Sequence, residues 1–153
     1  MLRRCKRFLW VQYSAVTRLL GGLFLSTSEL QGIQDAVDAY LQAIRTGEAT
    51  YFARAFYRDA VVIYAGERDQ DKMVTPIRVF AERIKDRHMS GIDSEEIPLG
   101  ITTSYVGDVA NVRLDFKLRI GERILYGTDY LNLVKHRDQW KISQKIYDVT
   151  RTE

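Results

Sequence analysis

The chain has 153 residues, of which 46% are hydrophobic and 11% aromatic, which is enough to bury the core of one domain. The first 28 residues hold five basic and no acidic side chains, so the remainder carries 18 basic groups (23 minus 5) against 20 acidic ones. A mixed, mildly acidic body has no basic surface of the kind that binds nucleic acid, and we expect no such partner.

Residues 1–28 are predicted to be an extension outside the domain. Their two apolar runs, 8–17 and 19–25, are split by Arg18, and each is shorter than the ~20 residues that a membrane-spanning helix needs. The segment suits a secretory signal, an organellar presequence or a disordered extension from an upstream start codon, and we favour the last. We therefore expect no stable membrane span, and a cytoplasmic rather than secreted or organellar location. The single cysteine, Cys5, excludes an intrachain disulfide.

The domain, residues 29–153, is predicted to open with two helices. Ser28 and Gln31 have the form of a capping box, and Gly47 is placed to end the first helix. The apolar residues between them recur at helical spacing: Leu30, Ile33, Val37, Tyr40, Leu41 and Ile44. A shorter helix with Ala49, Phe52, Ala53 and Phe56 on one face then leads into a β-branched strand over residues 61–64.

A third helix is predicted to start at Thr75 and Pro76, an N-cap followed by proline at the first helical position, with Ile77, Phe80 and Ile84 inward. From Ile97 onward the sequence predicts four long antiparallel strands.

Turns are expected at residues 107–108, 121–122 and 136–139. Apolar and polar residues alternate through residues 109–120, so that strand buries one face. The order of elements predicts an α+β domain with its helices on one face of a curved sheet.

The last two strands form the most distinctive part of the sequence. They read TDYLNLVK at residues 128–135 and WKISQKIY at residues 140–147. This hairpin resembles that of the nuclear transport factor 2-like (NTF2-like) proteins, most closely the group called putative lumazine-binding. The resemblance covers residues 29–150 and implies a cone-shaped, curved antiparallel sheet with three N-terminal helices packed on its concave face, a cystatin-like arrangement.

Two family motifs depart from their usual form. An F-H-P-x-A motif reads FYRDA at residues 56–60, and a K-x-F-H ending reads KIYD at residues 145–148. Both family histidines are missing, so the resemblance implies the scaffold and not any activity that depends on those imidazoles.

Domains of this class hold a pocket between the helices and the concave sheet face. The periodicity predicts an aromatic lining for it, and for each residue plain core packing is the alternative. The candidate ligand-binding residues are Tyr40, Phe52, Phe56, Tyr64, Phe80, Phe116 and Trp140.

Asp129 is the candidate catalytic residue. If Leu131 and Leu133 point inward, alternation sends Asp129 inward too, where burial would raise the pKa of its carboxyl and suit it to act as a base, a neutral donor or a partner for a cation. The alternative is a structural aspartate. Lys145 is a possible counter-charge, but strict alternation places Gln144 and Ile146 on the inner side, and only a bulge would turn Lys145 inward.

No residues suggest a metal or cofactor. His88 is predicted at a helix end and His136 in a turn, and neither has further potential ligands at the spacing that a zinc site needs. The sequence also lacks a glycine-rich phosphate loop, a serine-centred elbow and a cysteine–histidine pairing. We therefore expect no cofactor.

Three hypotheses of function follow. The first is a domain that binds a small planar or hydrophobic ligand. The second is a cofactor-free isomerase, dehydratase or hydrolase, with Asp129 as acid or base helped by Tyr40 or Tyr64. The third is an interaction module. A homodimer through the convex sheet face is expected, because Tyr126 and Tyr130 put apolar surface on the outer side of a strand whose inner side is apolar as well.

The extension is predicted to be dispensable for folding, because no later segment lacks a partner. Deleting residues 1–28 should lower the melting temperature by less than about 5 °C, on the order of 1–2 kcal/mol for a domain of this size. A larger fall in a thermal melt would show that the extension packs on the domain.

Overall fold

The architecture is that of a computed structural model, which describes residues 27–66 and 73–153. The predicted α+β layout is confirmed, with three helices and a six-stranded sheet. In chain order the elements are α1 (Thr27–Thr46), α2 (Ala49–Ala55), β1 (Phe56–Tyr64), β2 (Val74–Pro76), α3 (Ile77–Met89), β3 (Ser94–Val106), β4 (Val109–Ile120), β5 (Arg123–His136) and β6 (Gln139–Thr152).

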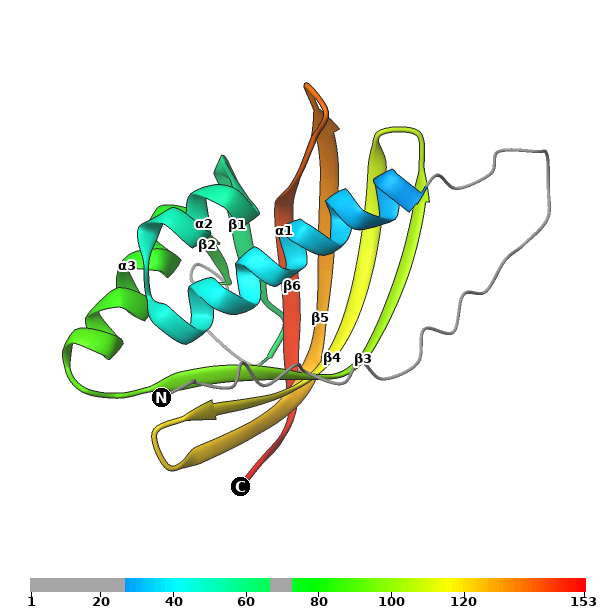
Figure 1. Ribbon diagram of the computed structural model, residues 1–153. Coiled ribbons are helices and arrows are strands. Elements are labelled where there is room, and N and C mark those ends of the chain that lie inside the picture. Colours follow the sequence, from blue (N-terminus) through cyan, green and yellow to red (C-terminus); the bar gives the residue numbers. More distant parts are fainter. Residues whose placement is uncertain (1–26, 67–72) are drawn as a thin grey trace, which may run out of the picture.

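The sheet has the strand order β2-β1-β6-β5-β4-β3. β1 runs parallel to β6 and every other neighbouring pair is antiparallel, so the sheet is mixed rather than purely antiparallel. Figure 1 shows α1 lying across one face of the long, curving strands, with α2 and α3 beside it over the β1 end of the sheet. The helices and this face of the sheet enclose the core.

Side-chain periodicity explains how the core is assembled. On α1 the buried residues recur at helical spacing, among them Ile33, Val37 and Tyr40. α1 ends at Gly47, as predicted, with a φ of +69° and an N–H that donates to the Ala43 carbonyl at 2.9 Å. On β4 the predicted alternation holds, with these residues buried: Ala110, Val112, Leu114 and Phe116.

The prediction for the start of α3 was wrong. Residues 74–76 form the short strand β2, in which Thr75 pairs with Val62 of β1, and the helix begins at Ile77. Pro76 takes the N-cap position with φ −57° and ψ 142°, so Thr75 caps nothing. The residue before a proline is disfavoured in helical conformation, which accounts for the extended approach.

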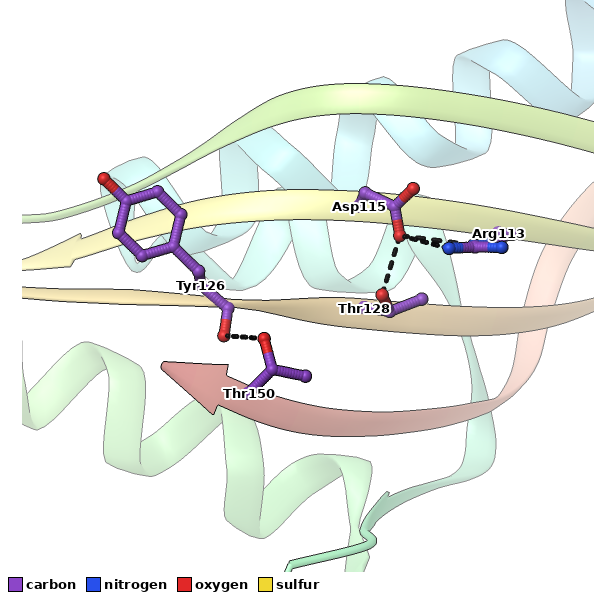
Figure 2. Close-up of polar contacts among 5 residues, drawn as sticks. All are labelled: Arg113, Asp115, Tyr126, Thr128 and Thr150. Atoms are coloured by element: carbon purple, nitrogen blue, oxygen red, sulfur yellow. Dashed lines mark hydrogen bonds and ion pairs between the residues drawn. The ribbon is translucent and has the colours of Figure 1, made fainter. Parts of the chain in front are cut away.

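Three bulges interrupt the long strands. In β3 the pairing with β4 shifts at Leu99, and in β6 the pairing with β5 shifts at Ser143 and at Thr150. Both extra residues of β6 carry hydroxyls that donate to carbonyls of β5. Ser143 Oγ donates to the backbone carbonyl oxygen of Asn132 at 3.0 Å. Thr150 Oγ1 donates to the backbone carbonyl oxygen of Tyr126 at 3.3 Å (Figure 2). Each bulge changes which side chains face inward.

The outer face of the sheet carries polar contacts between strands. Asp115 of β4 accepts a hydrogen bond from Thr128 of β5 at 2.6 Å and forms an ion pair with Arg113 at 3.1 Å (Figure 2). Apolar surface remains exposed on the same face of β5, where Tyr130 is 44% and Val134 37% exposed.

The close approach of β6 to β5 beside the Thr150 bulge requires glycine at position 127. A Cβ there would collide with the Asp148 carbonyl oxygen and would lie 2.6 Å from Phe116 Cζ. Gly127→Ala should therefore destabilise the protein by about 1–3 kcal/mol or more, as overpacking does.

Urea unfolding of the variant should show the loss, with Gly100→Ala as the control. Gly100 lies in β3, and the nearest heavy atom to an added Cβ is a side-chain oxygen at 3.6 Å. Equal midpoints for Gly127→Ala and wild type would mean that the backbone at residue 127 has room for a side chain.

Candidate functional site

Four polar side chains meet inside the domain, each from a different element. They are Tyr40 of α1, Glu96 of β3, Asp129 of β5 and Lys145 of β6, and we refer to them as the polar cluster. Their exposed fractions are 0%, 6%, 0% and 3%. Buried ionisable groups of this kind are rare in proteins unless they are paired or serve a function.

Tyr40 lies at the centre of the polar cluster. Its hydroxyl oxygen is 2.7 Å from Glu96 Oε2 and 3.0 Å from Asp129 Oδ2, and it accepts a hydrogen bond from Lys145 Nζ at 2.7 Å. Lys145 also forms an ion pair with Asp129 Oδ2. The ion pair and the tyrosine thus link α1 to three strands of the sheet.

Two oxygens of the polar cluster have no hydrogen-bond partner among the described residues. They are Glu96 Oε1 and Asp129 Oδ1, and both are fully buried. Most buried polar atoms in native proteins have a hydrogen-bond partner, so two buried carboxyl oxygens without one are an exception that needs a physical reason.

Lys145 faces the interior because of the Ser143 bulge, and the prediction from strict alternation was wrong. Leu133 pairs with Ile142, but Asn132 pairs with Gln144, so the extra residue reverses the side-chain direction beyond it. The ammonium lies 4.8, 5.8 and 4.9 Å from the ring centroids of Tyr40, Phe116 and Tyr147. Gln144 and Ile146 are directed to the outer side and are partly exposed.

Glu96 was missed by the sequence reasoning. The strands were expected from Ile97 onward, which left Glu96 outside them, and the apolar residues Ile97 and Leu99 are 36% and 52% exposed. β3 begins at Ser94, and Ser94 and Glu96 are the buried pair before the Leu99 bulge shifts the pattern. A longer strand would have suggested Glu96, but the apolar pattern argued for the opposite face.

Burial raises the pKa of two members of the polar cluster, Glu96 and Tyr40. Desolvation raises the pKa of Glu96 from a usual value near 4.5 to about 8, and the negative charge of Asp129 adds to the shift while Lys145 opposes it. Desolvation also raises the pKa of Tyr40 well above its usual value, reinforced by both carboxyl groups. At neutral pH, Glu96 is therefore mostly a neutral acid beside the Asp129–Lys145 ion pair.

Most of the predicted aromatic residues gather next to the polar cluster. The ring centroids of Phe56 and Tyr40 are 5.9 Å apart, Phe52 and Phe56 are 6.4 Å apart, and Phe52 and Phe80 are 6.3 Å apart. Tyr64 joins from β1, where its ring lies 5.0 Å from that of Tyr147. The core of the domain contains Tyr40, Phe52, Phe56 and Phe116, with Phe80 partly buried against them, and we refer to these rings as the aromatic interior.

Trp140 is also buried in the core, near the start of β6. Its Nε1 donates to Glu29 Oε2 at 2.8 Å, and its ring packs edge-on to Tyr105 at 6.2 Å. It also lines a surface hollow of about 470 Å³ between α1, α2 and the β5–β6 hairpin, together with charged residues such as Asp35 and Arg54. The hollow does not include any residue of the polar cluster.

The two histidines lie outside the polar cluster. His88 Nε2 is 2.9 Å from the Ile44 carbonyl and His136 is exposed at the end of β5. Within residues 27–66 and 73–153, no group of three histidine, cysteine or acidic residues is arranged to hold a metal. None of the described helices is long and apolar enough to cross a membrane.

Comparisons place the chain among known folds. The family model described as putative lumazine-binding matches residues 28–148. An NTF2-like protein of unknown function from Shewanella baltica is 22% identical, with a TM-score of 0.62 over 86% of this chain and 98% of that one.

A second NTF2-like protein of unknown function, from Silicibacter pomeroyi, is 20% identical, with a TM-score of 0.63 over 82% and 99% of the two chains. A hexachlorocyclohexane dehydrochlorinase is 12% identical, with a TM-score of 0.67 over 82% and 88%. At these identities the solved structures establish the NTF2-like fold alone. A search of functionally curated proteins finds no match.

The raised pKa of Glu96 predicts a pH dependence of stability. The folded-state pKa of Glu96, about 8, lies above the unfolded value near 4.5. The stability that protonated Glu96 contributes to the folded protein is therefore complete below pH 4.5 and is lost as pH rises toward 8. In Glu96→Gln, which cannot ionise, the free energy of unfolding should fall less between pH 5 and pH 8. The difference in slope should be on the order of 1 kcal/mol per pH unit.

Urea unfolding at several pH values measures this slope, and Glu95→Gln is the matched control. Glu95 precedes Glu96 on β3, and its side chain is 33% exposed. Parallel curves for wild type and Glu96→Gln would show that Glu96 has an ordinary pKa in the folded protein.

Proposed function

Because this chain belongs to the putative lumazine-binding family of NTF2-like proteins, we propose that it binds a small molecule whose polar end contacts the polar cluster. The observation that carries the proposal is the pair of buried carboxyl oxygens, Glu96 Oε1 and Asp129 Oδ1, without partners among the described residues. An unsatisfied buried acceptor costs about 1–3 kcal/mol, which a ligand donor would recover.

The aromatic interior supports the same proposal. Ligand sites are mostly apolar, with a few polar groups that fix orientation. Phe56 and Phe116 provide apolar surface next to Tyr40 and Lys145. A planar or hydrophobic molecule would pack against these rings, and its polar end would reach the carboxyl groups.

A second candidate function is proton transfer without a cofactor, in an isomerase, dehydratase or hydrolase. The specific observation is that two neighbouring carboxyl groups differ in protonation: Glu96 has a pKa of about 8, and Asp129 is ion-paired with Lys145. Such a pair can supply a base and an acid at one pH. A bell-shaped pH–rate profile would distinguish this function from binding alone.

Native mass spectrometry of the full chain tests the binding proposal. Protein purified without added ligand should carry a bound mass that is lost on denaturation. Asp129→Asn keeps the shape of the side chain and removes its charge, so occupancy or affinity should fall roughly tenfold, as for one charge-assisted hydrogen bond.

Asp115→Asn on the outer sheet face is the control and should keep the bound mass. Wild-type protein that carries no bound mass, and that binds nothing in a screen of planar aromatic molecules, would contradict the proposal. If Asp129→Asn instead lowers the melting temperature and leaves binding unchanged, Asp129 is a structural residue.

We also propose that two copies associate through the outer sheet face, where Tyr130 and Val134 are exposed. Light scattering at micromolar concentration should give twice the chain mass of 17.7 kDa. Tyr130→Glu should shift the protein toward monomer, whereas Met89→Glu, at a more exposed apolar residue of α3, should not. A monomeric wild type would refute the association.

A further inference from the structure

We propose that the ligand of the polar cluster is an uncharged molecule that presents N–H or O–H donors to Glu96 Oε1 and Asp129 Oδ1. The inference rests on the proposed function and names the chemical class of the ligand. It depends on which hydrogen-bonding groups the protein leaves available.

Two of the three N–H donors of the Lys145 ammonium have partners within the protein. Its ammonium donates to Tyr40 Oη and is ion-paired with Asp129 Oδ2. On its other sides the Tyr40, Phe116 and Tyr147 rings lie within 5.8 Å, so the ammonium is enclosed by aromatic faces. A ligand therefore meets Lys145 as part of an ion pair and not as a free cation.

Two further protons of the polar cluster, one on Tyr40 and one on Glu96, also have acceptors within the protein. The Tyr40 hydroxyl lies between Glu96 Oε2 and Asp129 Oδ2, and it has one proton to donate. The neutral Glu96 carboxyl supplies a second proton, carried on Oε2, which lies 2.7 Å from the Tyr40 hydroxyl oxygen, so that the Tyr40 proton goes to Asp129 Oδ2. The polar cluster then leaves two buried oxygens without a partner among the described residues, a carbonyl-type oxygen of Glu96 and a carboxylate oxygen of Asp129, and both are acceptors.

The charge of the polar cluster argues for a neutral ligand. One ammonium and one carboxylate balance, and Glu96 is mostly uncharged near pH 7. An anionic ligand would place its own hydrogen-bond acceptors against the acceptor oxygens of Glu96 and Asp129. None of these buried oxygens would then have a donor. A cationic ligand would add an unbalanced charge unless Glu96 gave up its proton.

Three isosteric probes separate these cases: benzamide, benzamidinium and benzoate. They share a ring and a planar substituent, and the substituent is respectively a neutral donor, a cationic donor and an anionic acceptor. Binding is measured with the full chain by ligand-detected and protein-detected NMR titration. At pH 7, benzamide should bind at least about tenfold more tightly than benzoate.

Benzamidinium provides a second readout. Its binding favours ionised Glu96, so its affinity should rise as pH increases toward about 8 and level off above it, whereas benzamide affinity should not rise. Glu96→Gln should abolish the pH dependence of benzamidinium binding. Asp115→Asn, on the outer face, should leave all three affinities and their pH dependence as in wild type.

The outcomes are distinct. If benzoate binds as tightly as benzamide, the donor assignment is overturned while the proposal that the domain binds small molecules stands. If no probe binds, this inference is overturned, and the native mass spectrum decides the proposed function separately. If Glu96→Gln does not fold, the pH series on wild type decides alone, and a flat benzamidinium curve overturns the inference.

Discussion

The structure depends on one buried ion pair, Lys145 with Asp129. Removing two charges from water is expensive, and their attraction compensates only when the remaining polar atoms are also satisfied. Tyr40 supplies part of that satisfaction from α1, and Glu96 reduces the cost by staying neutral. Because the four groups come from one helix and three strands, the ion pair also fixes how α1 lies on the sheet. Loss of one partner would leave the other charge buried and alone.

The ion pair exists only because of a bulge. Without the extra residue Ser143, strand alternation from Ile142 would direct Lys145 to the outer face and leave Asp129 without its counter-charge. The Ser143 hydroxyl stabilises the bulge by donating to the Asn132 carbonyl. Farther along β6 the Thr150 hydroxyl stabilises its bulge in the same way, by donating to the Tyr126 carbonyl. The Ser143 bulge thus decides which side chain of β6 faces Asp129, and it matters to the polar cluster as much as the identity of the residues does.

Regular periodicity could be read from the sequence, and its interruptions could not. The alternation through β4 predicted its buried face, and Leu131 and Leu133 placed the Asp129 side chain on the inner side of β5, where it lies. Lys145 and Glu96 escaped prediction because each depends on the register around an inserted residue. A bulge costs little locally and is settled by packing across the whole sheet, so a single strand sequence carries little trace of it. Serine and threonine at the two β6 bulges are a weak signal that is clear only in retrospect.

The two positions where the family carries histidine have other roles in this chain. Tyr57 donates its hydroxyl proton to the Val134 carbonyl at 3.1 Å, and the exposed Asp148 accepts from the Val149 N–H at 2.9 Å. Neither side chain contacts the polar cluster through these bonds. A proton-transfer site needs a group that titrates near neutral pH, and imidazole is the usual source. Here burial gives a carboxyl group, Glu96, a pKa of about 8, so the site has a group that titrates in that range without histidine.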